Sequence, residues 1–383
     1  MVLAAALALV ASACKRDPPQ DPLVSKIDAA LGRSAAFLVS QQDPDGAFRS
    51  KQYAAFRDGW ATTPLALSFL LFAPPSPQVD SAYRRGVDFL AGLVDDQGAV
   101  REPLEYPVYS AAGALLVLAN PRNERHAAKK AALVRFLRAR QLTEENGWQP
   151  SDPEYGGWGY WPGIPKKAKE GEPKDELLGS TLSSTTWAVG ALVLSGVPPS
   201  DPALQAARRF VERCRADDGG FFLTPTNPVA NKAGAIEGAG FRGYGSATAD
   251  ATRVLLRLGT PRADPLLAGA ERWLLSHVDG AHQSGTFPPA QEFAREGSRF
   301  YSAWSQAHAL TVLGQKDVGT PPRPWPTLFA EELLAAQRPD GSFVNAATDL
   351  REDDPLVATP LAAATLALAR AAHLGERPTM LKR

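Results

Sequence analysis

The sequence has very little sulfur, no net charge and few segments typical of β-strands. Its 41 basic and 41 acidic side chains cancel, and a chain without a positive field gives little support to nucleic-acid binding. A hydrophobic share of 44% with 21% charged residues is that of a folded globular protein. Because strand signals are scarce, we expect helices to bury most of this apolar surface.

The chain opens with an apolar run, MVLAAALALVASAC, which is too short to cross a bilayer because a spanning helix takes ~20 residues. Such a run is typical of a secretory signal. It ends in Ala11-Ser12-Ala13-Cys14, which resembles the bacterial lipobox, in which the cysteine is lipidated after cleavage. We therefore expect residues 1–14 to be a lipoprotein-type signal peptide and residues 15–24 to be a Pro-rich tether. The alternative is an apolar terminus with no targeting role.

Lipidation of Cys14 would place the mature protein in the bacterial cell envelope, on the periplasmic or extracellular side, with the lipid anchor as its only membrane contact. The chain has only 2 cysteines, so Cys214 would then have no disulfide partner. We expect Cys214 to be a buried structural thiol.

A repeat runs through the rest of the chain. FLVSQQDPDGAF (37–48) returns near the other end as LLAAQRPDGSF (333–343), which aligns Gln42 with Gln337 and Gly46 with Gly341. Other segments share an apolar helix followed by a glycine turn, and Gln141 falls where Gln42 does. Six copies are predicted, with turn glycines Gly46, Gly98, Gly147, Gly219, Gly285 and Gly341.

A second helix follows each turn and is apolar nearly all round, as expected for a helix buried on every side. These helices are predicted at 63–72, 109–119, 184–196, 246–259, 301–314 and 359–371. Thr63-Pro64 and Thr359-Pro360 are predicted helix starts, with threonine as N-cap and proline at the first helical position. The helices before the turns are amphipathic, which predicts an inner ring within an outer ring.

Open arrays of repeats leave apolar faces at both ends, and closing the array into a ring removes those faces. We therefore predict an all-α (α/α)6 toroid of six helix pairs, as a single domain over 25–375 with a tail at 376–383. The repeat, with Phe37-Leu38, Gln42, Gly46 and Phe48, resembles the QW-type repeat of the squalene-cyclase and protein-prenyltransferase superfamily. The resemblance implies this toroid, but a fold does not by itself imply an activity.

A site is expected where the inner helices begin, because the long connections 149–180, 223–245 and 288–299 lead to that rim. Aromatic residues there could line a cavity for an apolar or isoprenoid-like ligand; the alternative is ordinary core packing. The candidate ligand-binding residues are Trp60, Tyr106, Tyr109, Trp158, Trp161, Trp187, Tyr244, Tyr301, Trp304 and His308. Tyr155 and Tyr160 lie in the same aromatic loop as Trp158 and Trp161, and Lys166, Lys167 and Lys169 follow as possible cations for an acidic group.

The chemistry that the resemblance implies is only partly present. Squalene-type cyclases protonate their substrate with an Asp-x-Asp-Asp-Thr motif, and the nearest match is Thr248-Ala249-Asp250-Ala251-Thr252. Asp250 is therefore the candidate catalytic acid; its alternative role is to interact with the dipole of its helix. Protein prenyltransferases hold zinc with Asp, Cys and His from the inner ring, and no predicted inner helix has a cysteine.

His277, Asp279 and His282 have spacing that could hold zinc, but a solvated loop is favoured, and we expect no metal and no cofactor. Toroids that act on glycans pair aromatic platforms with two carboxylates. Candidate acids for that chemistry are Glu154, Asp175, Glu237, Asp250 and Glu292.

The favoured interpretation is an envelope-anchored toroid that binds an apolar ligand or a protein partner at the inner-helix rim. A terpene cyclase or prenyl-type transferase with a divergent acid site, or a glycan-active enzyme, remains the alternative.

Overall fold

A computed structural model describes residues 21–102, 105–173, 175–347 and 350–376 of the chain. The predicted signal peptide with Cys14, most of the tether and most of the tail lie outside the described residues.

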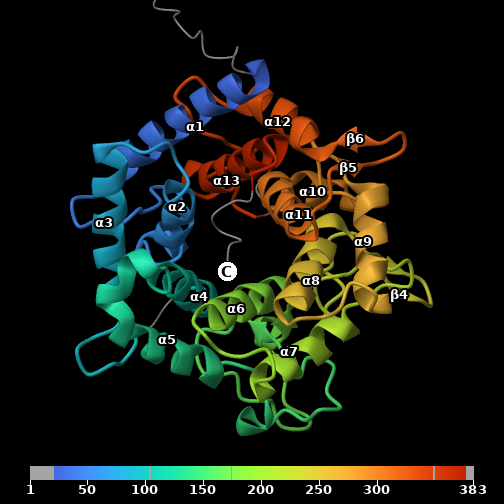
Figure 1. Cartoon of the computed structure of the whole chain (residues 1–383). Helices are drawn as coiled ribbons and strands as arrows, with labels where there is room; N and C mark the ends of the chain where they lie inside the picture. Colours follow the sequence, from blue (N-terminus) through green and yellow to red (C-terminus); the bar gives the residue numbers. More distant parts are fainter. Residues whose placement is uncertain (1–20, 103–104, 174, 348–349, 377–383) are drawn as a thin grey trace, which may run out of the picture.

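Helices alternate along the chain between an outer and an inner position and form an all-α toroid (Figure 1). The outer helices are α1 (Pro22–Gln41), α3 (Pro77–Ala91), α5 (Ala127–Ala139), α7 (Pro202–Arg213), α9 (Pro265–His277) and α12 (Trp325–Ala336). The inner helices are α2 (Thr62–Leu70), α4 (Pro107–Leu118), α6 (Leu182–Leu194), α8 (Gly245–Arg257), α11 (Arg299–Leu313) and α13 (Pro355–His373). Each inner helix packs on the next, and α13 packs on α2, so the inner ring is closed.

Short elements fill the connections. The strands pair in antiparallel twos: β1 (Trp158–Gly159) with β2 (Ser180–Thr181), β3 (Ala235–Ile236) with β4 (Gly240–Phe241), and β5 (Asp317–Val318) with β6 (Arg323–Pro324). The short helices are α10 (Glu292–Glu296) and the 3-10 turns η1 (Ala54–Phe56), η2 (Pro121–His126), η3 (Glu144–Asn146), η4 (Glu176–Leu178) and η5 (Pro289–Gln291). The strands are too short to form a layer of their own, in line with the all-α prediction.

Several outer helices begin with an acidic or hydroxyl N-cap followed by proline. Asp21, Asp201 and Asp264 accept backbone N–H groups at the starts of α1, α7 and α9, and Ser76 does the same for α3. Proline at the first helical position suits these caps because its missing N–H would have no partner there. The outer helices are thus defined locally by sequence.

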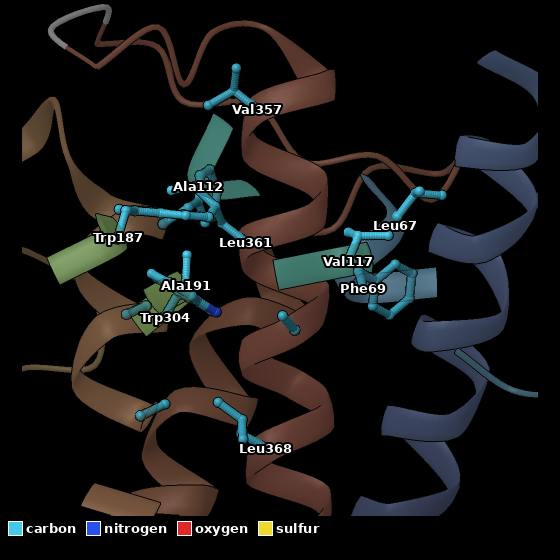
Figure 2. Packing of buried hydrophobic residues seen from close by; sticks show 14 of the residues in the cluster. Leu67, Phe69, Ala112, Val117, Trp187, Ala191, Trp304, Val357, Leu361 and Leu368 are labelled. Carbon is cyan, nitrogen blue, oxygen red and sulfur yellow. The ribbon is translucent and has the colours of Figure 1, made fainter. Parts of the chain in front are cut away.

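Burial of an apolar surface all round defines the inner helices instead. In α6 the described side chains from Leu182 to Leu192 are all buried. Helix α13 is long and apolar enough to cross a membrane by length and composition, yet it is largely buried against α1, α2, α11 and α12. Figure 2 shows part of the resulting core, where Trp187 of α6, Trp304 of α11 and Leu361 of α13 belong to one buried cluster.

The repeated glutamine clamps one outer helix to the next. The Gln42 amide donates to the carbonyl of Gly46 in its own turn (2.9 Å) and to that of Ala82 on α3 (2.8 Å). Gln337 makes the same pair of bonds to Gly341 (3.3 Å) and to Ala30 of α1 (2.9 Å). Because α12 and α1 are the last and first outer helices, this second clamp closes the outer ring.

In the third repeat the turn glycine is Gly156, and its assignment to Gly147 from sequence was wrong. The clamp of Gln141 goes to Gly156 O (2.7 Å) and to Ala203 O of α7 (2.8 Å). Gly156 has φ +91°, and a Cβ there would lie 2.1 Å from Ala206 O. Gly147 also has positive φ, but it ends the turn η3 inside the insertion. The aromatic residue that completes the third motif is therefore Trp158.

Threonines join each of these turns to an inner helix. The backbone N–H of Phe48 donates to Thr63 Oγ1 and that of Phe343 donates to Thr359 Oγ1, both at 3.0 Å. Neither threonine is an N-cap, so the predicted helix starts were wrong: α2 begins at Thr62, and α13 begins at Pro355 with Pro360 inside it. The same bond recurs from Trp158 to Thr185 and from Phe221 to Thr248.

Candidate functional site at the inner-helix rim

The starts of neighbouring inner helices meet at one rim. Tyr109 and Ser183, in the first turns of α4 and α6, share a hydrogen bond of 2.8 Å. Glu352, just before α13, accepts the N–H groups of Phe300 and Tyr301 in the first turn of α11. These contacts require α4 and α6, and α11 and α13, to begin on the same side.

Asp250, on α8, is a second buried acid near this rim. Tyr301 donates to its Oδ2 (2.7 Å), and Ser305 donates to its Oδ1 (2.5 Å). Arg253 Nη1 also lies 3.1 Å from Oδ1, as an ion pair whose side chains are almost fully buried. Burial raises the pKa of the Asp250 carboxyl, opposed by the Arg253 guanidinium and by the two hydroxyl donors.

Half-buried tyrosines lie at the rim, and one of them, Tyr301, contacts this carboxyl. Tyr160 stacks on Tyr109 with ring centroids 6.0 Å apart, and its hydroxyl lies 3.3 Å from Ser183 Oγ. Burial raises the pKa values of Tyr109 and Tyr301 well above the ordinary value, so both hydroxyls stay protonated at neutral pH. The rim thus offers uncharged aromatic faces beside Asp250.

Two tryptophans lie across the ring interior. Trp187 of α6 stacks on Trp304 of α11 at 5.7 Å between centroids, although α8 separates these helices in the ring. The Arg253 guanidinium lies over the Trp304 ring, with Cζ 4.3 Å from the ring centroid. Both tryptophans are about nine-tenths buried. We call this stacked pair the tryptophan floor.

The Arg351 guanidinium packs on aromatic rings at the side of the rim where α2, α4 and α13 begin. Arg351 Cζ lies 5.0 to 5.4 Å from the ring centroids of Tyr53, Phe56 and Tyr106. Tyr106 and Arg351 are also the non-glycine residues with positive φ (49° and 57°) in the described part of the chain. Strained backbone on both partners indicates that their contact is imposed by the surrounding structure.

The structure brings some of the predicted ligand-binding residues together and separates others. Tyr106, Tyr109, Trp187, Tyr301, Trp304 and His308 form one connected group with Tyr160. Trp60 stacks on Phe89 beside a surface cavity of about 490 Å³. Trp158 is fully buried and donates to Leu137 O, and Trp161 packs with the separate cluster of Trp148 and Tyr155.

Tyr244 is buried and precedes α8, where its ring lies 6.4 Å from that of Phe287. The role of each of these residues in ligand binding stays a prediction. Two of the three loop lysines have side-chain partners: Lys167 pairs with Asp152 (2.7 Å), and Lys166 donates to Glu145 O (3.0 Å).

The other candidate acids are dispersed. Glu154 is buried and accepts from Thr226, Asp175 caps η4, and Glu237 is exposed in the turn between β3 and β4. His277 stacks on Trp273 and its Nδ1 lies 2.9 Å from Trp273 O, whereas His282 Nδ1 lies 3.4 Å from Asp279 Oδ2. Within the described ranges no group of three His, Cys, Asp or Glu residues could hold a metal ion. Cys214 is a buried free thiol at the end of α7, and burial raises its pKa.

Sequence reasoning missed Arg253, Arg257, Ser183 and Ser305, and it named Tyr160 only as part of the aromatic loop. One signal for the arginines was available. Positions 250, 253 and 257 lie on one face of a helix, so a helix predicted to be buried carried Arg253 and Arg257 beside Asp250.

No protein-family model and no curated protein sequence matches the chain. Solved structures do match, and they share the toroid fold. A variant of the type II terpene cyclase MstE from Scytonema, in complex with the product merosterolic acid A, has a TM-score of 0.60 at 15% identity, over 92% of this chain and 99% of that one. A protein from Actinoplanes has a TM-score of 0.56 at 19% identity, over 90% and 99%.

A glycosidase variant also matches, with a TM-score of 0.51 at 14% identity, over 93% of this chain and 98% of that chain. Identities this low establish the fold alone, since one toroid serves terpene cyclases and glycosidases alike.

Proposed function

We propose that this chain is an (α/α)6 toroid of six helix pairs, similar to terpene cyclases, that binds an apolar, isoprenoid-like ligand at the inner-helix rim. The observation that carries the proposal is the group of half-buried tyrosines, Tyr109, Tyr160 and Tyr301, of which Tyr301 contacts the buried Asp250 and Tyr109 and Tyr301 pack on the tryptophan floor. Aromatic faces of this kind bind apolar chains through large contact areas. The half-buried state of the tyrosines leaves part of each ring open to a ligand.

The comparison with MstE supports the choice of ligand class. MstE variants are seen with geranylgeranyl dihydroxybenzoate, an isoprenoid-bearing substrate, and have TM-scores of 0.59 to this chain. The apolar rim of the present chain is compatible with a ligand of similar chemistry.

Titration of the purified protein with geranylgeraniol tests this function. Native mass spectrometry should detect a one-to-one complex, and quenching of tryptophan fluorescence should give its affinity. Replacing Trp304 by leucine should weaken binding about fivefold, because an aromatic contact contributes ~1 kcal/mol beyond its area. Trp148→Phe, in the separate aromatic cluster, is the matched control and should bind normally. Failure of the alcohol to bind would exclude the apolar ligand and leave a protein partner as the occupant of the rim.

Proton transfer from Asp250 is the second candidate function. Burial raises the pKa of this carboxyl, and a protonated carboxylic acid beside aromatic faces suits cyclisation that starts by protonating an alkene. The Arg253 ion pair favours the ionised form of Asp250 instead. Ligand binding is therefore the first candidate function and proton transfer the second. Turnover of a polyprenyl substrate that is lost in Asp250→Asn while binding persists would establish catalysis; the absence of any turnover in the wild type would exclude it.

Anchoring in the bacterial cell envelope through lipidated Cys14 is part of the same proposal. The expected observation is a membrane-associated protein, labelled by a fatty-acid analogue, that becomes unlabelled in Cys14→Ala. A wild-type protein that carries no label would contradict the anchor without affecting the rim.

A further inference from the structure

A basic cluster on α8 lies beside Asp250 and against Trp304 of the tryptophan floor. Helix α8 carries Arg253 one turn beyond Asp250 and Arg257 a further turn beyond Arg253. Arg253 is 5% exposed and pairs with Asp250, whereas no hydrogen bond or ion pair links half-buried Arg257 to another described residue. Two guanidinium groups therefore share a single carboxylate, and the cluster has excess positive charge.

The position of Arg257 is defined by helix α6. A Cβ on Gly190 would lie 3.3 Å from Arg257 Nη1, so the guanidinium lies against α6, where this helix has a glycine. Burial, with Arg253 nearby, lowers the pKa of Arg257 to about 9. The group is thus still a cation at neutral pH.

Three buried nitrogen atoms around Trp304 have no hydrogen-bond acceptor among the described residues. They are Arg253 Nε, His308 Nδ1 and Trp187 Nε1, from three different inner helices, and their residues are 5%, 6% and 9% exposed. The rings of Trp187 and His308 lie 5.7 and 5.9 Å from that of Trp304, and Arg253 lies over it. More than nine-tenths of buried polar groups in proteins have a partner, and an unpaired donor costs about 1–3 kcal/mol.

We propose that these residues form an oxyanion-binding subsite for a carboxylate or phosphate group. Arginine suits such a group because its planar fork donates to two oxygens at once. Trp187 Nε1 is a donor only, and the neutral imidazole of His308 donates from Nδ1 in one of its tautomers. Burial and the two arginines hold the pKa of His308 well below its usual range, so a bound anion would offset the charge that keeps this ring neutral. The subsite adjoins the proposed apolar rim and shares Trp187 with it, but its excess positive charge and its unpaired donors do not depend on the apolar ligand.

Binding of inorganic phosphate and of acetate, at constant ionic strength, tests the proposal. A ligand that binds the folded state raises the melting temperature in a saturable way. We expect this rise in the wild type and in Arg272→Met, which removes an exposed arginine from α9, and its loss in Arg257→Met. Arg257→Lys, which keeps the charge without the fork, should retain part of the effect. Comparing the two anions identifies the preferred group.

A second readout does not depend on any variant. A bound anion beside His308 should raise the pKa of its imidazole, which NMR titration measures in the wild type with and without phosphate or acetate. An unchanged His308 pKa with both anions, or an equal rise in melting temperature for wild type and Arg257→Met, would overturn the proposal. The three donors would then be satisfied by buried water.

Discussion

Glu352 joins the loop before α13 to the first turn of α11 through both of its carboxylate oxygens. Oε1 accepts the N–H of Tyr301 (2.7 Å), and Oε2 accepts the N–H of Phe300 (3.0 Å). Burial raises the pKa of Glu352 from 4.5 to about 7, against these hydrogen bonds. The Glu352 carboxyl thus keeps its proton to a higher pH in the folded protein than in the unfolded chain.

The stabilisation from Glu352 should therefore be complete below about pH 4.5 and be lost as the pH rises through about 7, with a maximum of about 3 kcal/mol. Urea denaturation between pH 4 and 8 measures this slope, and Glu352→Gln should remove it. The glutamine variant loses an acceptor at every pH, so only the pH dependence is diagnostic. Equal slopes in both proteins would contradict the raised pKa.

Gly156 tests the correction made to the third repeat. Its positive φ alone disfavours alanine by about 1–2 kcal/mol, and a Cβ 2.1 Å from Ala206 O adds a backbone clash. We expect Gly156→Ala to lower the free energy of unfolding by ~4 kcal/mol. Gly196 has φ +101° with nothing within 4 Å of its Cβ, so Gly196→Ala should cost only about 1–2 kcal/mol. Equal costs would show that Gly156 is not in contact with α7.

Gly46 and Gly341 could be predicted from sequence because their surroundings are nearly identical, whereas Gly156 could not. The insertion after Gln141 contains two pairs of glycine and aromatic residue, Gly147-Trp148 and Gly157-Trp158. The first has almost the expected spacing. Contacts of the folded chain distinguish them, such as the hydrogen bond from Gln141 to Gly156 and the close approach of Gly156 to Ala206. Such contacts across a loop have no sequence period.

Each of the threonine hydrogen bonds joins two elements, an outer turn and an inner helix. Thr359→Val should leave the buried N–H of Phe343 without an acceptor and cost about 1–3 kcal/mol. Thr365, on the same helix, only donates to Leu361 O, so Thr365→Val should cost distinctly less. Thermal unfolding of the two variants gives the comparison; a Thr359→Val as stable as Thr365→Val would mean that the bond contributes nothing.

The inner helices were predicted because apolar residues on all sides require burial on all sides. The predicted starts of these helices were less accurate, because Thr-Pro also suits a helix interior. In α13 the turn before Thr359-Pro360 already belongs to the helix, which begins at Pro355 after the N-cap Asp354. The rim acid was also predictable as a lone Asp250. Its partners Tyr301 and Ser305 come from α11, and the tryptophan floor joins α6 to α11 across α8. Such contacts depend on how the ring closes, which no local pattern encodes.

Closure of the outer ring is a property of the whole molecule, and Gln337 tests it. In a closed ring Gln337 clamps α12 to α1 as Gln141 clamps α5 to α7. Both Gln337→Ala and Gln141→Ala should therefore lower the free energy of unfolding by about 1 kcal/mol or more. In an open array the last clamp would have no partner. A neutral Gln337→Ala beside a costly Gln141→Ala would show that the ends separate in solution.

The contact between the first and last helices also makes the ring suitable for circular permutation. His373 Nε2 lies 2.9 Å from Asp21 Oδ2, so the two ends of the described chain are neighbours. A permuted gene that joins these ends with a short flexible linker, and starts at the exposed residue Pro199, should encode the same ring. Circular dichroism and a single melting transition like that of the parent are the expected result. The fold would then depend on which repeats are neighbours in the ring and not on which repeat comes first in the chain.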